Sequence, residues 1–294
     1  MSELLRRYGF GLSSIFILLT AFWLLLLVVL PDLYLFDNSF RPFLPALDVG
    51  GPKDRYNIAN YAAFFQTPIH LQVFGLTILF ASIVTAVCFV LSYPIAYYLA
   101  KVADPHNVAT LFLLLLIPLW VSEILRCFAL FIMLSFKGPL NMSLIGLGII
   151  HEPIRWIVAY NSVIIGLVYV YILFMLFPIY NAIQSLDTNQ IEAARDLGSP
   201  WWRTHWRVIM PHSKPGIASG CVMVFMLSAG SLFVPSLLGS TTSRWFTEII
   251  QQWMFESFDW NTGAAYAFLL LLLCTIFVSL MMRVFRVSLA DIAK

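Results

Sequence analysis

The chain has 294 residues, of which 61% are hydrophobic and 11% charged, and its mean hydropathy is +0.87. That balance excludes a soluble globular protein and is typical of a protein that crosses a membrane several times. The formal net charge of +2 gives no indication of nucleic-acid binding. We therefore expect an all-α membrane protein with a single transmembrane domain over residues 1–294.

Six apolar segments are each long enough to span a hydrocarbon core of roughly 30 Å, which takes about 20 helical residues. They are predicted at about residues 12–30, 70–100, 108–135, 160–185, 216–238 and 264–284. The first follows Arg6 and Arg7 and lacks the small-residue cleavage site of a secretory signal, so we expect it to remain uncleaved. Before the second span, Asn57–Phe65 is predicted to be a short helix at the membrane interface.

Four prolines fall inside or near the ends of predicted spans, namely Pro94, Pro118, Pro178 and Pro235. Neighbouring helices often absorb such kinks, and a bent helix can also line a pathway, so both interpretations stay open. The sequence shows no inverted repeat with paired broken helices of the kind found in secondary carriers.

The distribution of basic residues predicts which side of the membrane each end occupies. Six spans place both termini on one side, and cytoplasmic loops carry an excess of Lys and Arg. With a cytoplasmic N-terminus, the inner side holds Arg6, Arg7, Lys101, Arg195, Arg203, Arg207, Lys214, Arg283, Arg286 and Lys294. The outer side then holds Arg41, Lys53, Arg55, Lys137, Arg155 and Arg244. We therefore expect both termini in the cytoplasm.

Two charged residues lie within the predicted third span, where a charge costs about 2.5–3.5 kcal/mol on insertion scales. Glu123 and Arg126 are three residues apart on one helix face, so they either neutralise each other or line a solute pathway. Trp120 can flank the same face. Before the last span, Asp259 and Trp260 combine a carboxylate with an aromatic ring, which suits an ammonium-bearing solute. These five residues are the predicted substrate pathway.

Residues 187–214, DTNQIEAARDLGSPWWRTHWRVIMPHSK, form the longest polar interruption in the C-terminal half of the chain. Asp187 or Asn189 can cap a helix at its start, and Gly198 suits the left-handed position that ends one. Ser199 is expected to cap a second helix, which runs on to a stop at Pro211. The pattern predicts two helices joined by a glycine hinge.

The first of these helices offers a flat surface for another protein. Ala193 and Ala194 are small enough for close approach, and Glu192, Arg195 and Asp196 around them can form charge-assisted hydrogen bonds. An ordinary solvated loop is the alternative. The hinge and the small-residue surface together favour a docking element on the cytoplasmic face.

This segment resembles the EAA loop of ABC-importer permeases. The match runs through Glu192-Ala193-Ala194, three residues, Gly198, nine residues, Val208, one residue and Met210-Pro211. The family favours Ile and Leu at the Val208 and Met210 positions, and both changes are conservative. In that family the loop is a coupling helix held in a groove of the ATPase subunit. The resemblance implies a type I ABC-importer permease with ATPase-coupling residues Glu192, Ala193, Ala194, Gly198 and Pro211.

Three further stretches are similar to the spermidine/putrescine permease family, in its first-permease branch: Ile117–Leu130, Pro153–Tyr180 and Phe258–Ala265. The similarity covers most of the chain from the second span onward. Leu173 stands where the family commonly has a proline, and Glu123 replaces an expected uncharged polar residue. Both departures lie where solute choice can change, so the resemblance leaves the particular polyamine open.

The resemblance implies a multi-pass permease of the bacterial inner membrane that forms the path for a small cation, a polyamine such as spermidine or putrescine. Its implied partners are a second permease, two ATPase copies that bind ATP and Mg, an extracytoplasmic solute-binding protein and lipid, with no nucleic acid. Another small amine or amino-acid-derived solute is an alternative. A secondary carrier or channel that works alone is a different class, against which the EAA-like loop argues.

The sequence contains no motif typical of an enzyme active site or a metal-binding site. The four cysteines are scattered in apolar runs and are expected to be small buried side chains: Cys88, Cys127, Cys221 and Cys274. The histidines lack ligand-like spacing, and no Ser/His/Asp or Cys/His arrangement is present. No glycine-rich loop ends in Lys-Ser or Lys-Thr, so the chain does not bind ATP by that route. We expect no catalytic residue, metal or cofactor in this chain.

Overall fold

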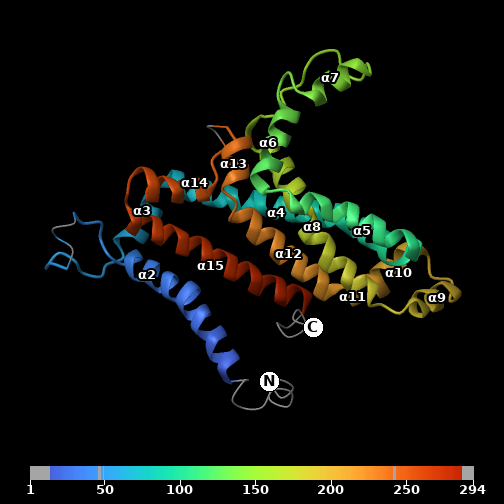
Figure 1. Cartoon of the computed structure of the whole chain (residues 1–294), viewed down its shortest axis with the longest axis horizontal. Coiled ribbons are helices and arrows are strands. Elements are labelled where there is room, and N and C mark those ends of the chain that lie inside the picture. The colour runs from blue at the N-terminus through green and yellow to red at the C-terminus, as the bar shows by residue number, and fades with distance from the viewer. Residues whose placement is uncertain (1–13, 46–47, 49, 241–242, 287–294) are drawn as a thin grey trace. The chain divides into compact units, whose positions relative to one another are not determined.

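The computed structural model describes residues 14–45, 48, 50–240 and 243–286, and all the regular elements in these ranges are helical (Figure 1). The all-α prediction is confirmed. The chain divides into two compact units, Met1–Pro68 with Ile250–Leu269, and Ile69–Ile249 with Leu270–Lys294. Arg6, Arg7 and the start of the predicted first span lie outside the described residues.

Five of the described helices are long and apolar enough to cross a membrane: Ser14–Ser39, Pro68–Val102, Glu123–Gly146, Tyr160–Gln184 and Trp260–Phe285. Two shorter apolar helices run over His106–Trp120 and Lys214–Ala229. Together they overlap the six segments predicted from the sequence, although Ser14–Ser39 and Glu123–Gly146 extend beyond the predicted ends. The count of six spans stays a prediction, because these assignments rest on length and composition.

In the first unit, the N-terminal helix is longer than predicted. It includes η1 (Leu25–Val29), a π-helical turn, and α2 (Leu30–Ser39), so the helix continues past Pro31. A proline lacks the N–H that an α-helical ladder needs, but here it follows a π turn in which the ladder is already displaced. The helix therefore ends at Ser39 and not near residue 30, where the predicted first span ends.

The predicted short helix at Asn57–Phe65 is present as α3 (Ala59–Gln66). Its buried Phe64 packs edge-on against Tyr266 in the first turns of α15 (Trp260–Phe285), with ring centroids 5.4 Å apart. Asn261 of α15 donates its side-chain N–H to the carbonyl of Asn38, at 3.0 Å. These contacts hold α2, α3 and the start of α15 together as one packed unit.

The second unit contains most of the remaining helices and the end of α15. These helices are α4 (Pro68–Tyr97), η2 (Tyr98–Val102), α5 (Pro105–Trp120), α6 (Glu123–Leu134), α7 (Pro139–Gly146), α8 (Ala159–Gln184), α9 (Thr188–Asp196), α10 (Trp201–Thr204), η3 (His205–Ile209), α11 (Met210–His212), α12 (Lys214–Ala229), α13 (Phe233–Leu238) and the start of α14 (Phe246–Gln251). The end of α14 and η4 (Gln252–Glu256) belong to the first unit.

The tightest packing in the second unit is between α8 and α12, which run along each other (Figure 1). Two glycines of α12, Gly216 and Gly220, lie one turn apart against α8. A Cβ added at Gly216 would overlap the carbonyl of Pro178 and lie 2.6 Å from the Cβ of Ala182. A Cβ at Gly220 would lie 2.7 Å from the sulfur of Met175. The two backbones therefore approach as closely as small residues at membrane helix interfaces allow.

Two predicted spans are each broken in the structure. The segment at about residues 108–135 divides into α5 and α6 at Val121 and Ser122, both of which have extended backbone. The segment at about residues 216–238 divides into α12 and α13 after Gly230. Polar Ser122 and conformationally free Gly230 each weaken the helix at these points, and an apolar run of the right total length conceals such a break.

Polar side chains satisfy the backbone at the second break, which is a requirement for irregular backbone inside a membrane protein. The indole N–H of buried Trp245 donates to the carbonyl of Ser228, at 3.0 Å. The hydroxyl of Thr247 donates to the carbonyl of Ser231, at 2.6 Å. The break is thus a built feature of the fold rather than a frayed end.

Candidate functional site

The coupling segment, residues 187–214, begins as predicted. The Asp187 carboxylate accepts the backbone N–H of Asn189 at 3.0 Å and so caps α9. Gly198 has a φ of +74°, in the left-handed region, and its N–H bonds to the carbonyl of Arg195 at 2.8 Å. The predicted glycine stop is therefore confirmed.

The second half of the coupling segment differs from the prediction. Pro200, and not Ser199, occupies the N-cap position of α10. The chain then stays helical through η3, a π turn, and through Pro211 to the end of α11, one residue before α12 begins. Pro211 follows a π turn just as Pro31 does, so its missing N–H again does not end the helix.

One face of α9 is open. Ile191 is buried and anchors the helix, whereas Glu192 and Ala193 are exposed and Ala194 is half-buried. Leu197, which the sequence analysis did not single out, is 88% exposed. We call Glu192, Ala193, Ala194 and Leu197 the docking patch. Leu197 and Ala193 both expose apolar surface here, and contiguous exposed apolar surface is a feature of faces that another protein covers.

The chain on either side of the docking patch is held to the end of the second long helix at two points. Before the docking patch, Lys101 of η2 donates to the carbonyls of Gln184, at 3.4 Å, and Leu186. After it, His205 Nδ1 shares a hydrogen bond of 2.9 Å with the hydroxyl of Tyr93. Burial, and secondarily the charge of Arg195, lowers the pKa of His205, which favours the neutral ring.

Glu123 and Arg126 do not form an ion pair in the described structure. The carboxylate of Glu123 instead accepts the hydroxyl of Tyr171 on α8, at 2.8 Å. Buried Arg126 donates Nη1 to the carbonyl of Val170, at 3.2 Å, and its Nε has no hydrogen-bond partner among the described residues. Both side chains therefore connect α6 to α8 by hydrogen bonds, and they do not neutralise each other as an ion pair.

The other predicted pathway residues have different surroundings. Trp120, the last residue of α5, is 79% exposed. Asp259 caps α15, because its carboxylate accepts both the backbone N–H of Thr262, at 3.0 Å, and its hydroxyl, at 2.7 Å. Trp260 is about half-exposed and lies edge-on to Phe255. Asp259 thus has a structural task that the sequence analysis did not foresee.

Comparison with known proteins decides the class of this chain. A family model described as binding-protein-dependent transport system inner membrane component matches residues 109–287. The chain belongs to this family. The spermidine/putrescine transport system permease protein PotB of Escherichia coli is 38% identical to this permease over 264 residues, which cover 90% of the permease and 92% of PotB. PotB of Haemophilus influenzae is 34% identical over 83% of both chains.

Solved structures agree in fold. A bacterial alginate ABC transporter in complex with an alginate pentasaccharide-bound periplasmic protein covers 98% of this permease, with a TM-score of 0.75 and 15% identity. The MetNI methionine ABC transporter covers 74%, with a TM-score of 0.55 and 15% identity. The fold is that of a type I ABC-importer permease, and the chain is a transport subunit of the inner membrane rather than an enzyme.

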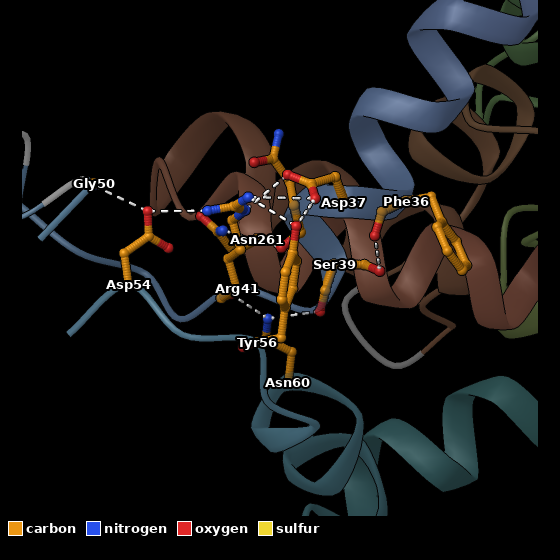
Figure 2. Close-up of polar contacts among 10 residues, drawn as sticks. Phe36, Asp37, Ser39, Arg41, Gly50, Asp54, Tyr56, Asn60 and Asn261 are labelled. Atoms are coloured by element: carbon orange, nitrogen blue, oxygen red, sulfur yellow. Dashed lines mark hydrogen bonds and ion pairs between the residues drawn. The ribbon is translucent and has the colours of Figure 1, made fainter. Parts of the chain in front are cut away.

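The loop between α2 and α3 of the permease contains a charge network that the sequence analysis missed. Arg41 donates to Asp37 at 2.7 Å and to Asp54 at 3.0 Å, and Tyr56 donates to Asp37 at 2.6 Å (Figure 2). The backbone N–H of Gly50, followed by Arg41, holds the pKa of Asp54 below its usual range. Residues far apart in this loop are thereby fixed in one arrangement.

A partly polar pocket of about 610 Å³ is lined by residues of α8, α12 and the end of the coupling segment of the permease. Its lining combines Phe174 and Met223 with the polar side chains of Asn181 and Ser219. His212 of the coupling segment also lines it. This mixture of aromatic and uncharged polar groups was not apparent from the sequence, because it depends on which faces of two helices meet.

Proposed function

We propose that this permease forms the membrane path of an ATP-driven importer of polyamines, spermidine or putrescine. The observation that carries the proposal is its 38% identity to PotB over nine-tenths of both chains. The open docking patch supports coupling to an ATPase, since it exposes Leu197 beside two alanines. Another small amine remains the second candidate, because Glu123 and Leu173 depart from the family pattern.

The proposed assembly contains this permease, a related second permease, two ATPase subunits and an extracytoplasmic binding protein. The ATPase subunits hold ATP and Mg. The extracytoplasmic binding protein is supported by the alginate transporter of similar fold, whose structure is a complex with a periplasmic protein. In this arrangement both termini and the coupling segment are cytoplasmic, and the Arg41 loop lies outside, where its fixed shape suits a surface that a binding protein meets.

The proposed mechanism passes ATP binding to the spans through the coupling segment. Closure of the ATPase dimer moves the docking patch, and the contacts of Lys101 and His205 carry that movement to the second long helix. The helices then change from an inward-facing to an outward-facing arrangement, and the solute passes from its binding protein into the open membrane path. The Gly198 hinge lets α9 follow the ATPase without unwinding the helix that follows it.

Uptake by the reconstituted complex tests the proposed function. Proteoliposomes that contain all four kinds of subunit should accumulate radiolabelled spermidine or putrescine only with internal ATP and external binding protein. Transport without the ATPase would instead show a secondary carrier or channel. Competition by unlabelled amines identifies the solute class, and uptake of an uncharged solute in place of a polyamine would overturn the proposal.

Glu123→Gln is expected to lower polyamine uptake at least tenfold while the complex still assembles, because Arg126 does not already neutralise this carboxylate. Tyr171→Phe is the matched control, since it removes this hydrogen bond and leaves the charge, whereas Glu123→Gln removes the charge and leaves an amide oxygen that can accept the same hydroxyl. Radiolabelled uptake at equal complex content is the measurement. Loss of uptake by Tyr171→Phe with full uptake by Glu123→Gln would show that Glu123 acts only by tying α6 to α8.

Two substitutions of Asp259 distinguish its role as a helix cap from the role of its negative charge. Asparagine caps helices as well as aspartate does, so Asp259→Asn should preserve α15 and lower uptake if the charge captures the cation. Asp259→Ala should lower uptake and also reduce thermal stability, by about 1 kcal/mol for the lost cap. Full uptake by Asp259→Asn would leave this residue with a structural role alone.

A further inference from the structure

A second cavity in the structure is apolar and has one lysine, Lys214, in its lining. It encloses about 670 Å³ and is lined by residues of α4, the coupling segment, α12 and the last half of α15. The hydroxyls of Ser82 and Thr85 in its wall bond to carbonyls of their own helix, at 2.8 Å, so they offer no free donor. Aromatic Phe277 and the thiol of Cys221 complete a wall suited to hydrocarbon.

Lys214 is the only charged residue among those that line this cavity, and no carboxylate lies within ion-pair distance of it in the described structure. It stands in the first turn of α12, where the helix dipole disfavours a cation. Arg207 and Arg283 are close in sequence to lining residues and are exposed. The segments that form the wall, residues 68–97, 205–229 and 270–285, contain no Asp or Glu at all.

We infer that this cavity binds one anionic phospholipid, with an acyl chain among Phe277, Cys221 and Ala86 and the phosphate at Lys214. Basic pockets between transmembrane helices on the cytoplasmic side bind anionic lipid headgroups. Trp206 in the lining is exposed and has the amphipathic ring typical of headgroup depth. A polyamine does not fit, because the one charge in the lining repels it.

The inference does not rest on the proposed solute, because the charge and lining of the cavity are independent of what is transported. Its consequence is that a lipid molecule would contact the coupling segment, through Trp206 and Pro211, and the spans at the same time. Bound lipid would then be a structural component of the link between ATPase and bundle.

Native mass spectrometry of the purified, delipidated importer tests the inference with two matched pairs of variants. Added phosphatidylglycerol should be retained, and phosphatidylcholine with the same acyl chains should not. Lys214→Glu should weaken phosphatidylglycerol retention roughly thirtyfold, as expected for reversal of one charge at a headgroup site. Lys137→Glu, outside the cavity, should not change it.

The second pair changes volume rather than charge. Ala86→Trp fills the cavity and should abolish retention, whereas Val90→Trp, one turn further along α4 and 66% exposed outside the cavity, should not. Equal retention in all four variants would overturn the inference. A photoreactive group at Phe89 provides an independent measurement: labelling of added phosphatidylglycerol supports the lipid, and labelling of the second permease in its place shows that a partner helix fills the cavity and refutes it.

Discussion

Gly216→Val should abolish folding of most of the expressed permease. A side chain at this position overlaps the carbonyl of Pro178 and the Cβ of Ala182, so α8 and α12 cannot keep their spacing. Overpacking costs about 1–3 kcal/mol where side chains can move, and more where the obstacle is backbone. The expected result is loss of most detergent-extractable protein and a lower melting temperature of the remainder.

Gly75→Val is the control for this prediction. Gly75 is also a glycine within a long apolar helix, but a Cβ there meets nothing within 4 Å. Its substitution should therefore leave extraction and melting close to those of the wild type. Equal behaviour of the two variants, both stable or both lost, would show that contact between α8 and α12 does not limit folding.

Gly198→Asp should separate ATP hydrolysis from transport, with solute-stimulated hydrolysis reduced at least tenfold and membrane insertion unchanged. The left-handed position penalises a side chain by about 1–2 kcal/mol, and the new carboxylate lies beside the docking patch. Both effects are expected to tilt α9 and to disturb its fit in the groove of the proposed ATPase partner. The measurements are ATPase co-purification and hydrolysis stimulated by solute-loaded binding protein.

Gly148→Asp controls for backbone strain, because Gly148 has a φ of +71° and equally open surroundings but lies after α7. It should retain coupling of ATP hydrolysis to transport.

Ala193→Trp places bulk directly on the docking patch and should reduce ATPase co-purification, whereas Arg203→Gln should reduce co-purification less. If the arginine variant dissociates the ATPase and the alanine variant does not, the docking face has been assigned to the wrong side of the segment.

Sequence reasoning succeeded where the signal is local. The cap at Asp187 and the stop at Gly198 depend on side-chain chemistry and backbone freedom within a few residues, and both are present in the structure. The family resemblance likewise rested on short motifs, and the comparisons confirm it. Apolar composition was sufficient to predict an all-α membrane protein, because lipid leaves backbone polar groups few other solutions.

It failed where the outcome depends on which helices meet. Pairing Glu123 with Arg126 was reasonable from their spacing, but α8 supplies better partners in Tyr171 and the carbonyl of Val170. No local pattern shows that α6 faces α8. Asp259 was also misjudged. Thr262, three residues later, is a pattern that favours capping by Asp259, but the sequence analysis considered only the charge of Asp259.

Proline was the other source of error. Pro31 and Pro211 were each expected to mark the end of a helix, and each instead follows a π turn within a continuous one. A π turn depends on a displacement of hydrogen bonds that has no strong sequence pattern, so helix boundaries at these two prolines were set too early. Pro211 also lines the apolar cavity of about 670 Å³, which the sequence analysis did not predict.

The two attachments on either side of the docking patch have a mechanical consequence. Lys101 and Tyr93 lie on one continuous helix, Pro68–Val102, and grip the chain on either side of the docking patch. A force applied at α9 therefore reaches that helix as a torque about its end, instead of being dissipated by bending of a loop. A rod of 35 residues converts a small rotation at one end into a larger sweep at the other. In the proposed assembly this helix would act as a lever, whose short arm is the end next to the docking patch.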